Sequence, residues 1–303
     1  MPRRRRNPEP AHPPEWERPK MLALLAGAVA VVALLAAGLV AAVLPGLRGS
    51  SDRPSVRPSV TGGVAAPGAG SSPAAPTPVR TGATAASAAA LPAAGALQEV
   101  AEQDAVAQAV MPDVGDELAH PAPVSLSDPG APILLPAPAT TGPAGVATGF
   151  PQTPAGAMAQ LAAIDTAVLQ AGSLDAARAV AVSWIAPGGP TPTTWSTMQA
   201  LAQLFTATGL SGGGSPRLAV TLTPLMGQVK GSVGTSYVVP CLDFEIDVTL
   251  ASSTRGAVAD CQRMVWTGDR WMIGAGAEPA PAPAVWPDTD TSIEVGYRDL
   301  RRG

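Results

Sequence analysis

Residues 236–250 read SYVVPCLDFEIDVTL and carry the clearest strand pattern in the chain. Apolar and polar side chains alternate along this stretch, which is the period of a strand with one buried face. The expected buried face consists of Leu242, Phe244, Ile246, Val248 and Leu250, and the expected outer face of Cys241, Asp243, Glu245, Asp247 and Thr249. The stretch therefore predicts a long strand that packs one side on a core.

Shorter alternating stretches lie on both sides of this strand. Residues 217–226 precede it, and residues 257–266 and 270–275 follow it. Thr267-Gly268-Asp269 separates the last two and is typical of a hairpin turn. We expect an antiparallel sheet of about four strands.

Three amphipathic helices are predicted before the sheet. Thr153 and Pro154 are typical of a helix start and open a helix that ends near residue 170. Ser173 caps a second helix over residues 174–185. Thr191-Pro192 repeats the start signal for a third helix, which ends near residue 208. Helices followed by long antiparallel strands indicate an α+β domain in which a curved sheet wraps the helices.

The two cysteines of the chain, Cys241 and Cys261, flank a hairpin expected to turn near residues 251–254. That turn would place them nearly opposite each other, which favours a disulfide closing a loop of about 20 residues. The alternative is two buried free thiols. A catalytic thiol needs a base and residues 150–303 contain no His, while a zinc site needs four ligands.

Asp243, Glu245 and Asp247 share one face of the central strand. Such a row could be a cation site or an acidic docking face. It could also be a solvated face that pairs across the sheet with Arg255 or Arg263. The sequence favours the solvated face, because like charges about 7 Å apart do not form a tight cation site without further ligands.

Catalysis has little support in the sequence. Asp165 is the one helix carboxylate that could face inward, although a capping or surface role is favoured. The tryptophans could line a pocket or only fill the core, and they are Trp184, Trp195, Trp266 and Trp271. We predict a protein that is not an enzyme, with no catalytic, cofactor-binding or metal-binding residues.

Residues 21–44 are uncharged and entirely apolar, and as a helix they would be long enough to cross a bilayer. The preceding residues 1–20 are basic and Pro-rich, so we expect a disordered cytoplasmic tail and an extracytoplasmic remainder. A cleaved signal peptide is the alternative, but its apolar region is normally shorter. The predicted location is therefore the cell membrane, with lipid contacting residues 21–44.

Residues 45–149 are rich in Pro and Ala and predict a low-complexity linker. Within it, residues 96–111 (ALQEVAEQDAVAQAVM) predict a short helix, and Ile133-Leu134-Leu135 could form a strand at the domain edge. Of eleven aromatic residues only Trp16 precedes position 150, so the folded domain is expected over residues 150–277. A Pro-rich tail, 278–303, is expected to follow.

The net charge of −4 gives no case for nucleic-acid binding. Arginine supplies all but two of the 19 cationic side chains, and Ala and Pro are abundant. This composition is typical of a high-GC bacterium, here inferred to be Gram-positive.

The stretch MVWTGDRWMI at residues 264–273, after a helical N-terminal part, resembles the last two strands of the NTF2-like cone fold. The whole layout, with a short tail, one span, a linker and an outer domain, resembles VirB8/TcpC-like components of conjugation and type IV secretion machines. It also resembles, more weakly, the Mce-associated membrane proteins of actinobacteria.

Both resemblances imply a non-catalytic scaffold or assembly subunit that acts with other membrane subunits or by self-association. The alternative that they leave open is an accessory protein that binds lipid or cell-wall material inside the cone.

Overall fold

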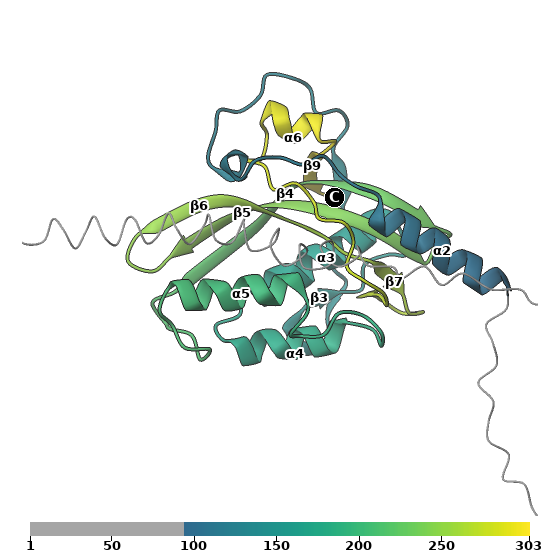
Figure 1. The fold of residues 1–303 in the computed structure, drawn as a ribbon, viewed down its shortest axis with the longest axis horizontal. Helices are drawn as coiled ribbons and strands as arrows, with labels where there is room; N and C mark the ends of the chain where they lie inside the picture. The colour runs from purple at the N-terminus through teal and green to yellow at the C-terminus, as the bar shows by residue number, and fades with distance from the viewer. Residues whose placement is uncertain (1–93) are drawn as a thin grey trace, which may run out of the picture.

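The computed structural model describes residues 94–303 (Figure 1). The predicted cytoplasmic tail, the predicted span at residues 21–44 and the first part of the predicted linker lie outside the described residues. Within residues 94–303, no helix is both long and apolar enough to cross a membrane.

Three helices cover one face of the sheet, namely α3 (Pro154–Leu169), α4 (Leu174–Trp184) and α5 (Ser196–Ala207). The side chains of Thr153 and Ser173 accept hydrogen bonds from the first turns of α3 and α4, as the sequence predicts. The predicted start of α5 at Thr191-Pro192 is wrong. The hydroxyls of Thr191 and Thr194 bond within their own turn, so that the helix begins only at Ser196.

The strands form one curled open sheet, which confirms the predicted α+β class. Its long strands are β4 (Ala219–Val233), β5 (Tyr237–Thr249) and β6 (Ser253–Cys261), and its short strands are β1 (Ile133–Leu135), β7 (Met264–Trp266), β8 (Trp271–Ile273) and β9 (Arg298–Arg302). Strand β5 pairs with β4 on one side and with both β6 and β7 on the other. The strand predicted over residues 257–266 is therefore two strands, divided between Cys261 and Met264. A separate small sheet pairs β2 (Thr140–Thr141) with β3 (Ala147–Thr148).

Strand β5 is buried on both faces. Leu242, Phe244 and Ile246 pack on the helices in the larger core. Tyr237, Val239 and Cys241 belong to a second core on the opposite side of the sheet. The predicted polar outer face is therefore wrong for the first half of the strand, because other parts of the chain cover it.

The cover consists of residues 94–132 and 278–297, here called the outer layer. Its helix α2 (Ala94–Gln108) matches the short helix predicted at residues 96–111 and packs along β4. The Tyr237 hydroxyl donates to the Gln103 carbonyl at 3.0 Å, and Lys230 Nζ donates to the Ala107 carbonyl at 2.9 Å. A 3₁₀ turn, η3 (Asp116–Ala119), follows α2.

Residues 94–149, which the sequence assigns to the linker, therefore belong to the folded domain. The edge strand expected at Ile133-Leu134-Leu135 is confirmed as β1, which runs parallel to β9. A second 3₁₀ turn, η4 (Pro143–Gly145), lies under α4, where the Pro143 carbonyl accepts from Trp184 Nε1 at 3.1 Å.

The predicted C-terminal tail also belongs to the domain. It contains helix α6 (Asp290–Glu294) and strand β9, and β9 pairs with β4. Tyr297 is fully buried, and its hydroxyl donates to the Pro283 carbonyl at 3.0 Å. The Pro- and Ala-rich segments lack large side chains, but their backbone carbonyls accept hydrogen bonds from buried aromatic hydroxyls such as that of Tyr297.

Cys241 and Cys261 form the predicted disulfide and face each other directly in the β5–β6 register. The bridge lies in the core beneath the outer layer.

Gly231 lets α2 approach β4, because a Cβ at this position would lie 2.7 Å from Cγ1 of Val106. We predict that Gly231→Ala lowers the free energy of unfolding by about 1–2 kcal/mol and speeds protease cleavage within α2. Gly172→Ala is the matched control, since a Cβ there meets nothing within 4 Å. Equal urea midpoints for the two variants would contradict this account of α2 packing.

Removal of the disulfide in a Cys241→Ala, Cys261→Ala variant should destabilise the domain by about 3 kcal/mol, because the closed loop restricts the unfolded chain. For a domain of this size we expect a thermal midpoint lower by about 6–12 °C. A reductant should produce the same drop in the unaltered protein and none in the variant.

Candidate functional site

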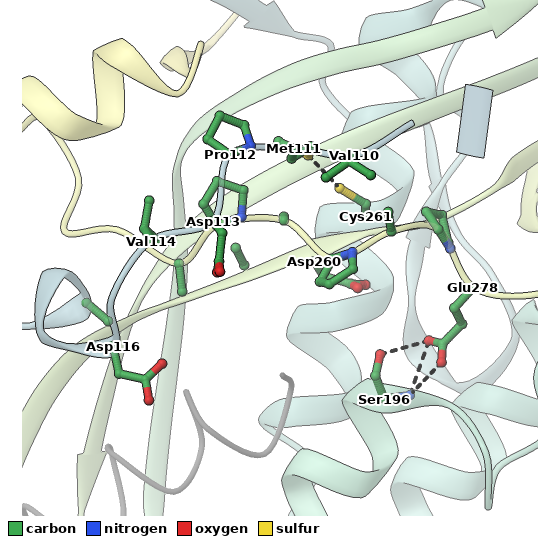
Figure 2. Close-up of a pocket in the computed structure, with 18 of the residues that line it drawn as sticks. Val110, Met111, Pro112, Asp113, Val114, Asp116, Ser196, Asp260, Cys261 and Glu278 are labelled. Atoms are coloured by element: carbon green, nitrogen blue, oxygen red, sulfur yellow. Dashed lines mark hydrogen bonds between the residues drawn. The ribbon is translucent and has the colours of Figure 1, made fainter. Parts of the chain in front are cut away.

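A cavity with polar groups in its lining lies between the outer layer, the end of β6 and the start of α5. Its volume is about 290 Å³. Figure 2 shows residues 110–116 along one side and Asp260, Cys261 and Glu278 along the other. The remaining lining comes from Ala119, Ser196, Ala259 and the Pro- and Ala-rich residues 279–284. We call this cavity the outer cleft.

Glu278 joins the outer layer to the N-terminus of α5. Both of its carboxylate oxygens accept from the Ser196 backbone N–H at 3.2 Å, and Oε1 also accepts from the Ser196 hydroxyl at 2.8 Å (Figure 2). The residue at the N-cap position is Trp195, whose side chain does not cap the helix. A carboxylate distant in sequence therefore supplies the missing acceptor, in a place where the helix dipole favours negative charge.

Asp260 lies beside Glu278 at the floor of the outer cleft. One buried amide, Gln262 Nε2, donates to both Asp260 oxygens at 3.0 and 3.1 Å and to Glu278 Oε1 at 3.2 Å. Burial and the nearby charge of Glu278 raise the pKa of Asp260 to about 7, despite the opposing hydrogen bond from Gln262. Asp260 thus exchanges its proton near neutral pH.

Asp165, from α3, lies behind Asp260. It is buried, and neither carboxylate oxygen has a hydrogen-bond partner among the described residues. Burial, followed by the charges of Asp260 and Glu278, raises its pKa well above the usual value. The capping or surface role favoured by the sequence is wrong, and the inward orientation is the one the structure shows.

A small void of about 20 Å³ adjoins Asp165, Thr197 and Asp260, between the helices and the sheet. It has room for about one water molecule. The void and the outer cleft share Ala259 and Asp260 in their linings.

The disulfide forms an apolar wall of the outer cleft. The thioether sulfur of Met111 lies 3.6 Å from the sulfurs of both Cys241 and Cys261. The bridged cysteines carry no thiol proton, so these are sulfur–sulfur packing contacts rather than hydrogen bonds.

The predicted acidic face does not form one open surface. Asp243 is fully buried, and no side chain of the described residues pairs with it; burial raises its pKa well above the usual value, although the Val285 backbone N–H acts in the opposite direction. Glu245 pairs with Arg255, as the sequence predicts, and Asp247 accepts from the Thr249 hydroxyl at 3.2 Å. Only the last two carboxylates keep partial exposure, because the outer layer covers the strand at Asp243.

The tryptophans fill the core instead of lining the outer cleft. Trp184, Trp195 and Trp271 are fully buried in the larger core. Trp266 is partly exposed and packs edge-on against Trp271 at a centroid distance of 5.4 Å.

The other predicted partner, Arg263, is buried and pairs with Asp104 of α2 at 2.7 Å. Among residues 94–303, no group of three or more His, Cys, Asp and Glu side chains is arranged to hold a metal ion. Residues 150–303 contain no His, but the outer layer adds His120 to the domain, at the end of η3 and outside the cleft lining.

Sequence reasoning missed Asp260 and Glu278. Asp260 sits among apolar residues of strand β6, and Glu278 stands in the Pro-rich stretch that the sequence predicts to be a tail. The only available signal was the isolated acid at the start of the EPAPAPAVW stretch.

No family model, no curated protein and no solved structure matches this chain.

The buried carboxyls predict that the domain becomes less stable as pH rises. Their pKa is raised in the folded state, so above about pH 4 the unfolded chain has released protons that the folded chain retains. The free energy of unfolding therefore falls with pH until the folded pKa is passed, which is about 7 for Asp260.

Asp165→Asn removes one of these ionisations and keeps the shape of the side chain. We expect this variant to lose less of its free energy of unfolding as pH rises. Its thermal midpoint at pH 8 should be higher by roughly 2–4 °C than that of the unaltered protein. The exposed Asp175→Asn variant is the control. Thermal midpoints that fall in parallel between pH 5 and pH 8 for all three proteins would contradict the assignment.

Proposed function

We propose that this chain is a membrane-anchored, extracytoplasmic assembly subunit without catalytic activity of its own. Its folded part serves as an NTF2-like domain, and its anchor is the apolar segment at residues 21–44. The proposed setting is a conjugation-like or secretion-like transfer complex of the VirB8/TcpC-like kind. Its partners are other membrane subunits or further copies of this chain.

The observation that carries the proposal is the filled interior. The space between helices α3, α4 and α5 and the sheet is occupied by the chain's own side chains, including Trp184, Trp195 and Trp271. The void beside Asp165 holds about 20 Å³, far below the several hundred cubic ångströms of a typical ligand site. A filled interior supports an assembly role over a lipid or cell-wall ligand held inside the cone.

Two further features agree with an outer location and with assembly. The disulfide between Cys241 and Cys261 is of the kind that persists in oxidising compartments. Large apolar side chains stay exposed on the described surface, among them Leu126 in the outer layer and Val182 on α4. Exposed apolar side chains are available for contact with a partner.

The test is site-specific photo-crosslinking of the full-length protein in the membrane of a high-GC Gram-positive host. A crosslinker replaces Leu126 or Val182, and exposed Asp269 is the control position. We expect a defined adduct with a membrane subunit or a second copy from at least one apolar position, and none from Asp269. Recovery of only the uncrosslinked monomer, with lipid bound, would overturn the proposal.

A further inference from the structure

Four residues of the outer cleft lining offer a carbonyl acceptor and no backbone N–H donor. Proline occupies positions 112, 279, 281 and 283 of its lining, and proline has no backbone N–H. The carboxylates of Asp260 and Glu278 add acceptors at the floor. A ligand that complements this lining must supply N–H groups.

The charged side chains of the lining also favour a ligand that carries N–H groups and positive charge. Four carboxylates border the cleft, Asp113 and Asp116 at residues 110–116 and Asp260 and Glu278 opposite (Figure 2). Among the described residues that line it there is no Lys, Arg or His.

Two cations whose partners include residues of the outer layer are already engaged. Lys230 Nζ donates to the carbonyls of Ala107 and Ala280, and Arg263 pairs with Asp104 and donates to the Ala277 carbonyl.

Asp165 adds a third carboxyl group behind the floor. It is 1% exposed, both its oxygens lack hydrogen-bond partners among the described residues, and it lines the void that shares Asp260 with the cleft. The groups that hydrogen-bond to Asp260 and Glu278 are all neutral, namely the Gln262 amide, the Ser196 donors, the Thr197 hydroxyl and the Cys261 backbone N–H. A buried carboxyl without a cation is held in its neutral form, and a cation placed beside it favours the charged form.

The rest of the cleft is apolar. Val110, Met111 and Val114 belong to the apolar lining, Met111 packs against the disulfide at Cys261, and Ala282 completes the apolar surface. Such a surface accepts a methylene chain, whereas a compact hydrated ion would gain nothing from it.

We propose that the outer cleft binds an aliphatic cation, an ammonium or guanidinium head on a short methylene stem. The head lies at Asp260 and Glu278, and the stem runs along Met111 and the disulfide. An arginine or lysine side chain of a partner protein and a free alkylamine share this chemistry. The site does not depend on the assembly role proposed above.

The test uses the full-length protein in detergent and isothermal titration calorimetry. The probe is n-butylguanidinium, and n-butylurea is the uncharged control of nearly the same shape. We expect saturable binding of the cation and at least about tenfold weaker binding of the urea, since hydrogen bonds to charged groups contribute roughly 1.5–3 kcal/mol. Equal binding of the two compounds, or no binding of the cation, would overturn the proposal.

Variants locate the site. Asp260→Asn should weaken n-butylguanidinium binding about tenfold, while Asp269→Asn, on the exposed β7–β8 turn, should leave it unchanged. If Asp260→Asn does not fold, a variant that combines Asp113→Asn and Asp116→Asn, both exposed, replaces it. We expect this variant to bind n-butylguanidinium about threefold more weakly. Unchanged affinity in the folded variants would overturn the assignment to this cleft.

Two further probes separate the sources of the cation. Tighter binding of N-acetyl-arginine methylamide than of agmatine would assign the cleft to a partner's side chain. The reverse order would assign it to a free amine. Both results support the cation site, and failure of both probes would contradict it.

Discussion

Strand β5 is buried on both faces, and this constraint shapes the rest of the structure. Its inner face meets the three helices, and its outer face carries Tyr237, Val239 and Cys241 against a second core. A sheet covered on one side only would leave that second face in water. The outer layer, drawn from sequence on either side of the helices and long strands, removes it from solvent.

The outer layer does this with few large side chains of its own. It supplies carbonyl oxygens to donors of the sheet, as Gln103 does for Tyr237 and Ala280 does for Lys230. Within the outer layer, the Pro283 carbonyl accepts from the buried Tyr297 hydroxyl in the same way. Proline favours such contacts because it holds the backbone extended and leaves its own carbonyl free. The same prolines leave four positions of the outer cleft lining without a backbone N–H donor, so the composition that closes the second core also sets the chemistry of the cleft.

The helices and the long strands could be predicted because local pattern determines them. Capping residues and the alternation in β5 led to α3, α4 and the central hairpin, and the opposed cysteines to the disulfide. The predicted start of the third helix at Thr191 was wrong, because hydroxyl groups there close a turn instead. The predicted open acidic face was wrong at Asp243, because alternation indicates on which side of the strand a residue lies but not what covers that side.

The sequence by itself determined the α+β class and the nearly opposite placement of the two cysteines, and it offered Arg255 as one of two partners for the acidic row. These depend on periodicities of two and 3.6 and on neighbours within a hairpin. Only the tertiary structure decided that residues 94–149 and 278–303 belong to the domain, and that Asp165, Asp260 and Glu278 converge. Those three carboxyl groups come from a helix, a strand and a Pro-rich segment. They meet because both sides of one sheet are buried, and no local sequence pattern predicts such a meeting.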